Sequence, residues 1–272
     1  MAIDFDALFA AYARERMTVT DDTPEDEIEE AAYALYHDFL ETPLAELDGR
    51  TTKEYAAELG TYGLLDEVLE CTREGIKPTD HLLDCLLKDE AAAEAALCEV
   101  LYDDAITSAE GVFVIDLLMD LESRKPLLRY EEILLNEDAD DALADAAAEA
   151  VIALNDGETA QELLRALPRM MGESTVRRIC DVLSYIPVEG AFEALSAVFT
   201  ASPDALSAQC LMRLGDPRGA EVLIDALPEA ALRYGDYLAI REAAEALGAV
   251  VDYEREFYGD ADYELMRGMM DE

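Results

Sequence analysis

The chain has 272 residues, of which 51% are hydrophobic, so it is long enough to bury a substantial core. Its 63 aspartates and glutamates against 20 lysines and arginines give a formal net charge of −43. So negative a surface repels phosphate backbones and anionic headgroups, which argues against nucleic-acid partners and against a membrane surface as a partner. The charge suits either a solvated surface, as in a salt-rich cytoplasm, or a face for a basic partner.

The N-terminal residues, Met-Ala-Ile-Asp-Phe-Asp, lack the basic and apolar regions of a signal peptide. No stretch approaches the roughly 18 to 20 apolar residues of a membrane span, so we expect a cytoplasmic protein. Alternating β-branched runs are missing and alanine-rich helical windows dominate, which predicts an all-α fold. Residues 1–59 depart from the repeat described below and are expected to form an N-terminal helical cap region.

Residues 42–54 read Thr-Pro-Leu-Ala-Glu-Leu-Asp-Gly-Arg-Thr-Thr-Lys-Glu. Asp48 and Gly49 are suited to a turn, and Thr51 or Thr52 to the N-cap of a helix. The segment is similar to the toxin-binding domain of certain bacterial antitoxins, in which a Leu-x-Gly-Arg-Thr-Pro segment precedes a helix; Thr52 stands where that pattern has proline. The resemblance implies a toxin-neutralising function, whereas a turn and a cap also explain the residues.

The candidate metal ligands are few. The two histidines, His37 and His81, lie far apart in sequence, and a zinc site or nucleophilic relay would need further clustered groups. Residues 136–141 read Asn-Glu-Asp-Ala-Asp-Asp but lack the glycine and glutamate of a calcium loop, so we interpret them as an inter-helix loop.

The cysteines are odd in number without a Cys-x-x-Cys pair, which indicates buried, reduced thiols. We expect no metal, cofactor or catalytic residue. The cysteines are Cys71, Cys85, Cys98, Cys180 and Cys210.

Between residues 60 and 250, apolar residues recur at offsets of 0, +3, +4 and +7, which places four side chains on one helical stripe. Such stripes return about every 30 residues, and only stacking of helix pairs would bury them in one continuous core. We name two registers, A and B. The A helices start their stripes at Ala160, Ala191 and Ala220, and the B helices at Val114, Ala147, Ile179, Ser207 and Ile240.

The junction at residues 214–220 reads Leu-Gly-Asp-Pro-Arg-Gly-Ala. Gly215 suits a left-handed C-cap, Asp216 an N-cap and Pro217 the first helical position, so one helix should end here and the next begin immediately. With the Ala-x-x-Leu-Ile-x-x-Leu helix that follows, this junction resembles the short HEAT repeats of phycobilisome-lyase-like proteins. The resemblance implies that residues 60–250 form a right-handed α-solenoid of stacked antiparallel helix pairs, with a concave partner-binding face and no particular reaction.

Six arginines concentrate in the clearest repeats. If they line one concave face, they form a positive island that could grip a carboxylate-rich or phosphorylated peptide. Alternatively they pair with neighbouring acids such as Glu162, Glu173 and Asp181. The candidate partner-binding residues are Arg165, Arg169, Arg177, Arg178, Arg213 and Arg218.

The C-terminal segment, residues 251–272, interleaves acids with apolar residues. We expect a capping helix over the last repeat or an acidic tail, with a detachable partner-binding motif as the alternative.

Together these observations predict a non-catalytic scaffold or adaptor that binds a protein or peptide, for which a basic partner would suit the charge. Two alternatives stay open: a lyase-like or hydrolase enzyme with its site in the concave groove, and an antitoxin-like protein. A cleft that joins His37 or His81 to acids and a reactive cysteine would favour the enzyme. A groove without perturbed titratable groups would favour the scaffold.

Overall fold

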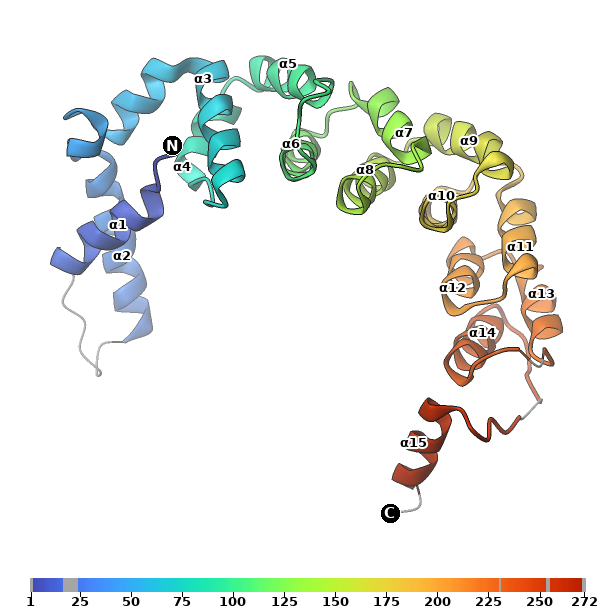
Figure 1. Ribbon diagram of the computed structural model, residues 1–272. Coiled ribbons are helices and arrows are strands. Elements are labelled where there is room, and N and C mark those ends of the chain that lie inside the picture. The colour runs from blue at the N-terminus through green and yellow to red at the C-terminus, as the bar shows by residue number, and fades with distance from the viewer. Residues whose placement is uncertain (1, 17–23, 230, 253–254, 271–272) are drawn as a thin grey trace. The chain divides into compact units, whose positions relative to one another are not determined.

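The computed structural model describes residues 2–16, 24–229, 231–252 and 255–270. Over these ranges the regular structure consists of 15 α-helices and two 3-10 helices, together with one isolated bridge between Leu44 and Arg50. The predicted all-α fold is confirmed. None of the described helices is both long enough and apolar enough to cross a bilayer. The chain divides into two compact units, residues 1–123 (unit 1) and 124–272 (unit 2) (Figure 1).

Unit 1 packs its helices around two groups of side chains. Helices α1 and α2 meet through an aromatic cluster in which the Tyr12 and Phe39 rings lie 5.5 Å apart. Helix α3 packs against α4, α5 and α6, and buries Leu65 and Val68 at this contact. The elements are α1 (Phe5–Arg16), α2 (Glu25–Leu40), η1 (Ala45–Leu47), α3 (Thr52–Glu74), α4 (Asp80–Leu87), α5 (Glu90–Leu101) and α6 (Ser108–Asp120).

The turn before α3 forms as the sequence predicts. Asp48 and Gly49 adopt left-handed φ angles of 56° and 80°. Thr51 is the N-cap of α3: its hydroxyl accepts the Glu54 backbone N–H, and its own N–H donates to the Glu54 carboxylate. The turn and these local hydrogen bonds explain why these residue types occur in the segment that resembles an antitoxin motif.

Helix α3 bends at Gly60, whose φ of 62° and ψ of −179° lie outside the helical region. This backbone conformation is essentially restricted to glycine, because a Cβ would collide with the neighbouring peptide groups. The glycine therefore allows one long element to change direction where it borders a surface depression.

Replacing Gly60 by alanine should lower the stability of unit 1 by about 1–2 kcal/mol, because the new Cβ strains the bend. Thermal and urea unfolding monitored by circular dichroism would measure the loss. Gly157→Ala is the matched control, since Gly157 has an ordinary φ and open space around its Cα. A Gly60→Ala protein as stable as that control would mean that α3 is not bent in solution.

Unit 2 is a row of helix pairs in two layers (Figure 1). In one layer α8, α10, α12 and α14 pack in succession; in the other α7 packs on α9 and α11 on α13. Within unit 2 the first of these layers lies on the inner side of the curve, and we call it the inner layer. The elements are α7 (Leu127–Leu135), α8 (Asp141–Leu154), α9 (Gly157–Ala166), η2 (Leu167–Arg169), α10 (Glu173–Tyr185), α11 (Ala191–Ala201), α12 (Ala205–Leu214), α13 (Gly219–Ala226), α14 (Tyr234–Ala246) and α15 (Ala261–Met270).

The two predicted registers coincide with these layers. The A stripes fall on α9, α11 and α13. The four later B stripes fall on the inner layer, and the first falls on α6 of unit 1. In α10 the whole stripe from Ile179 to Ile186 is buried. In α13 the prediction is wrong at Ile224, which is 37% exposed. Leu223 and Leu227 are buried as predicted, but packing of α13 on α11 and α14 buries Gly219 and Ala226 in place of Ala220 and Ile224, so the buried stripe is rotated by about one residue.

The junction between α12 and α13 differs from its prediction by a short turn. Gly215 is the left-handed C-cap of α12, with a φ of 73°, as expected. Asp216 and Pro217, however, lie in a turn closed by a hydrogen bond from the Gly219 N–H to the Asp216 carbonyl at 2.9 Å. Regular helix therefore starts only at Gly219. Asp216 caps the turn by accepting the Arg218 backbone N–H at 2.9 Å.

The inter-helix reading of residues 136–141 is confirmed. Asp140 is the N-cap of α8 and accepts the backbone N–H groups of Ala142 and Leu143. At the other end of unit 2, Phe257 is buried against the Tyr237 ring, with centroids 5.0 Å apart. Helix α15 itself keeps Leu265 63% exposed.

Candidate functional site

A groove of about 290 Å³ crosses three inner-layer helices of unit 2, α8, α10 and α12. We call it the inner groove. Its apolar part includes Ala148, Cys210 and Leu206, and the Leu206 side chain is 50% exposed. Its charged lining consists of Arg177, Arg178 and Arg213 together with Asp145, Glu149 and Asp181.

Arg178 joins α10 to α8. Its Nε donates to Asp145 Oδ1 at 2.5 Å, and its terminal nitrogen pairs with Asp141. Burial alone would lower the pKa of the Arg178 guanidinium, but the hydrogen bonds to both carboxylates outweigh that effect and raise the pKa. The arginine therefore stays charged while only 13% of its side chain is exposed.

Arg213 makes the equivalent connection from α12 to α10. It pairs with Asp181, donates to the Ser184 hydroxyl at 2.9 Å and lies 4.2 Å from the centroid of the Tyr185 ring. Two successive helix contacts of the inner layer are thus each bridged by an arginine.

Arg177 lies beside them on α10. Its guanidinium pairs with Glu173 of the same helix at 2.6 Å and approaches Asp204, the N-cap of α12, at 3.6 Å. Each of the three arginines in the groove is accompanied by at least one carboxylate.

The other three candidate arginines lie on outer-layer elements. Arg165 of α9 pairs with Glu162. Arg218, which precedes α13, pairs with Glu193 at 2.8 Å and with Asp216 at 2.7 Å. Arg169 ends η2. The structure therefore brings together Arg177, Arg178 and Arg213 and leaves the remaining three apart.

The predicted pairing of the arginines with Glu162, Glu173 and Asp181 is confirmed. The alternative, a positive island, does not form, because acids of α8 and α10 and the α12 N-cap Asp204 surround the arginines of the groove. The inner groove is a mixed-charge surface with an apolar centre.

Sequence reasoning missed Leu206 and Glu149. Leu206 immediately precedes the buried stripe of α12. An apolar residue outside the buried stripe of a helix is a signal that could have identified it. Glu149 is exposed, and within the described residues it has no ion-pair partner. No local pattern distinguishes it from the many other acids.

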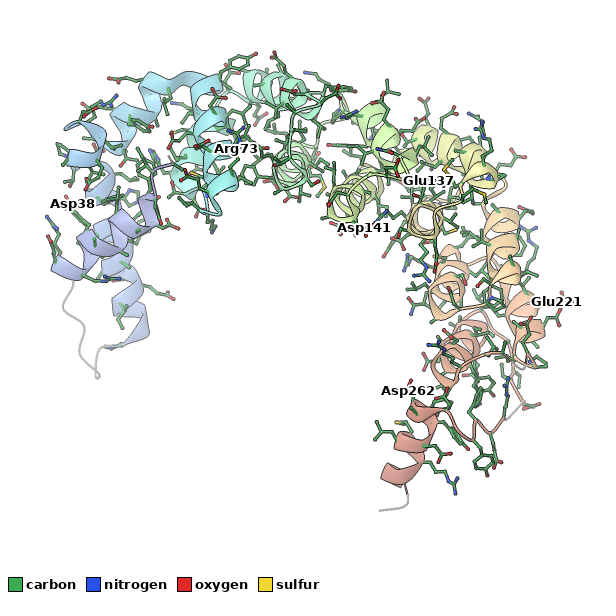
Figure 2. All side chains as sticks on the ribbon, viewed as in Figure 1. Asp38, Arg73, Glu137, Asp141, Glu221 and Asp262 are labelled. Atoms are coloured by element: carbon green, nitrogen blue, oxygen red, sulfur yellow. The ribbon has the colours of Figure 1, made fainter. Side chains whose placement is uncertain are left out.

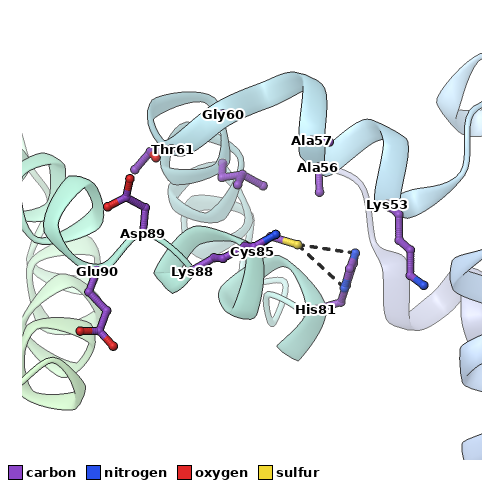
Figure 3. Close-up of a pocket in the computed structure, with 11 residues that line it drawn as sticks. Lys53, Ala56, Ala57, Gly60, Thr61, His81, Cys85, Lys88, Asp89 and Glu90 are labelled. Carbon is purple, nitrogen blue, oxygen red and sulfur yellow. Dashed lines mark hydrogen bonds between the residues drawn. The ribbon is translucent and has the colours of Figure 1, made fainter.

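A second depression, of about 860 Å³, lies in unit 1 between α3, α4 and the start of α5 (Figure 3). Here the Cys85 Sγ lies 3.8 Å from His81 Nε2 and 4.0 Å from His81 Nδ1. Lys53, Asp89 and Glu90 also border the depression. This is the kind of cluster that would favour an enzyme.

The electrostatics of the pair point the other way. Burial raises the pKa of the Cys85 thiol, and nearby Asp84 adds to the effect. Burial and nearby Lys53 lower the pKa of His81. Both groups are therefore neutral near pH 7, whereas a nucleophilic cysteine needs a lowered pKa.

The other histidine and the remaining cysteines form no comparable cluster. His37 lies against the Tyr33 ring, with centroids 4.5 Å apart. Burial raises the pKa of Cys180 to about 12 and that of Cys210 to about 11, and all five cysteines are thiols. In the part of the chain that the structure describes, no three His, Cys, Asp or Glu side chains are arranged to hold a metal ion.

Comparison with known proteins gave no match: no family model, curated protein or solved structure corresponds to this chain. The similarities to HEAT repeats and to antitoxins stay predictions.

Proposed function

We propose that the protein is a non-catalytic cytoplasmic scaffold or adaptor that binds a protein partner through the inner groove of unit 2. The observation that carries this proposal is the groove itself, which runs across three successive helices and combines an exposed apolar residue with fixed charges. Repeated helix pairs provide such extended surfaces without any catalytic group.

The lining of the groove suggests the chemistry of the partner. An apolar side chain would fit against Leu206, Ala148 and Cys210. A partner lysine or arginine could reach Glu149, while Asp141 remains largely exposed beside the groove (Figure 2). Glu149 has no ion-pair partner within the described residues and the Asp141 side chain is 76% exposed, so a basic partner can approach both carboxylates. A basic segment with an apolar anchor is therefore the partner that we expect.

The enzyme alternative rests on the His81 and Cys85 pair in unit 1. Its neutral thiol and neutral imidazole make it a poor nucleophile, so this alternative ranks below the scaffold. The antitoxin alternative has only the segment before α3 in its favour, and the capping box explains that segment.

The test is a pull-down from lysate of the source organism at low and at near-physiological salt, followed by mass spectrometry and by affinity measurement with each purified partner. The bait is compared with the double variant Glu149→Lys and Leu206→Asp. Glu221→Lys is the control for Glu149→Lys, because it makes the same charge reversal on the outer side of α13 (Figure 2). We expect a partner that survives the higher salt, binds at least about 10-fold more weakly to the double variant and binds normally to the control.

Two results would count against the proposal. A partner that binds the double variant as well as the parent protein would place the interface elsewhere. Retention of basic proteins only at low salt would mean that the negative charge of the protein binds them without specificity. That result would favour a small-molecule or enzymatic role.

A further inference from the structure

A third depression, of about 450 Å³, lies in unit 1 and shares no lining residue with the depression of His81 and Cys85. It is formed by α1, α2 and residues 77–80, which lead into α4. We call it the α1–α2–α4 pocket. Its lining combines aromatic rings with carboxylates: Asp6, Phe9, Glu29, Ala32, Tyr33, Tyr36, Lys77, Pro78, Thr79 and Asp80.

Three aromatic side chains border the pocket. The Phe9 and Tyr36 rings meet edge to face, with centroids 5.1 Å apart and an interplanar angle of 84°. Tyr33 is 69% exposed, so much of its ring is available to a ligand. The faces of such rings are negative and attract cations within about 6 Å.

Three carboxylates from three separate helices share the pocket. Asp6 belongs to α1, Glu29 to α2 and Asp80 to α4, and over the described ranges none of them has an ion-pair partner. Burial, followed by the charges of Asp80 and Asp6, holds the pKa of the Tyr36 hydroxyl above its ordinary value. The pocket lining therefore carries three carboxylates and one cationic side chain, Lys77.

Thr79 adds an unsatisfied acceptor. It lines the pocket, is only 6% exposed, and its hydroxyl has no hydrogen-bond partner among the described residues. Although Thr79 is the N-cap of α4, its side chain makes no capping hydrogen bond. A buried hydroxyl without a partner is costly, so the wall of the pocket contains one unmet hydrogen-bonding group.

We propose that the α1–α2–α4 pocket binds an organic cation, namely a primary ammonium or guanidinium group. The rings would contact its apolar and charged surface, while the carboxylates accept its N–H donors. The proposal does not depend on the function proposed for unit 2. Such a group can come from a free aliphatic diamine or from a lysine or arginine side chain.

Isothermal titration calorimetry of the full chain at about 0.15 M salt tests the pocket, with 1,4-diaminobutane and the acetyl amides of arginine and lysine as probes. Magnesium chloride controls for general attraction to the negative surface. The test variants are Tyr33→Ala and Glu29→Gln, both at exposed positions. The matched controls are Tyr62→Ala and Asp66→Asn, which remove a tyrosine ring and one carboxylate charge at exposed positions of α3 outside the pocket.

We expect saturable binding of one organic cation per chain, about 2- to 5-fold weaker in Tyr33→Ala and about 10-fold weaker when both test variants are combined. The controls should bind within about 2-fold of the parent protein. A tighter constant for the diamine would identify a free amine as the ligand, and a tighter constant for an amino-acid amide would identify a polypeptide side chain. Non-saturable binding, equal losses in the control variants, or equal binding of magnesium at one site would overturn the proposal.

Discussion

Replacing Leu183 by alanine should lower the free energy of unfolding of unit 2 by about 2–5 kcal/mol. Leu183 is fully buried in α10, and α10 contacts helices on both sides of it, α8 and α12 as well as α9 and α11. Removing the isopropyl group leaves a cavity that the neighbouring helices cannot fill without breaking their own contacts. Urea unfolding followed by circular dichroism would measure the change.

Leu206→Ala is the matched control, because it makes the same substitution in the same layer at a side chain that is 50% exposed. We expect a change within about 0.5 kcal/mol for this variant. Equal losses in the two variants would contradict the arrangement of the inner layer. Because a stacked array transmits order from pair to pair, Leu183→Ala should also broaden the unfolding transition.

The second large effect is expected at Glu110, where alanine should reduce the stability of unit 1 by about 2–3 kcal/mol. Glu110 is only 2% exposed. Its carboxylate accepts the Thr107 N–H at 2.9 Å and the Thr107 hydroxyl at 2.6 Å, which completes the capping box of α6. It also pairs with Arg73 Nε at 2.6 Å and so joins α6 to α3. The expected loss of stability is smaller than for a fully buried ion pair, because the Arg73 side chain is 50% exposed.

The same residue predicts a dependence on pH. Burial alone would raise the pKa of Glu110, but the hydrogen bonds from Thr107 and the charge of Arg73 outweigh it and hold the pKa below its ordinary value of 4.5. A carboxyl whose pKa is lower in the folded state than in the unfolded chain stabilises the protein at pH values above the unfolded-state pKa. This stabilisation is lost as the pH falls through the folded-state pKa. The stability difference between the parent protein and Glu110→Gln should therefore shrink from pH about 7 to pH about 3.5. A difference that is the same at both pH values would contradict the role of the charge.

The layers of unit 2 could be predicted because each helix must bury one face, and burial imposes a spacing that can be read in the sequence. Thr51 and Gly215 could be predicted because their hydrogen bonds are made within a few residues. Ile224 could not, because the rotation of α13 is decided by its contacts with α11 and α14. The bend at Gly60 escaped prediction for a similar reason: the helical pattern of α3 continues through it.

In the candidate site, too, contacts within one helix could be predicted and contacts between helices could not. Pairs within one helix, such as Arg177 with Glu173, follow from a separation of four residues. The contact of Arg178 with Asp145 joins positions on different helices, and no local pattern selects that acid from 63. Which arginines share a face depends on the layer to which each helix belongs. The three that meet in the inner groove all lie on α10 and α12.

The thiols offer a chemical reporter of each unit. Cys85 and Cys98 of unit 1 are only partly covered, whereas Cys180 and Cys210 of unit 2 are buried. A maleimide dye added to the folded protein should therefore attach in unit 1, and labelling in unit 2 should await its unfolding. Cys71 of unit 1 is buried as well, so the order in which Cys71 and the two thiols of unit 2 take up dye during gradual denaturation would show which unit opens first, without any engineered residue.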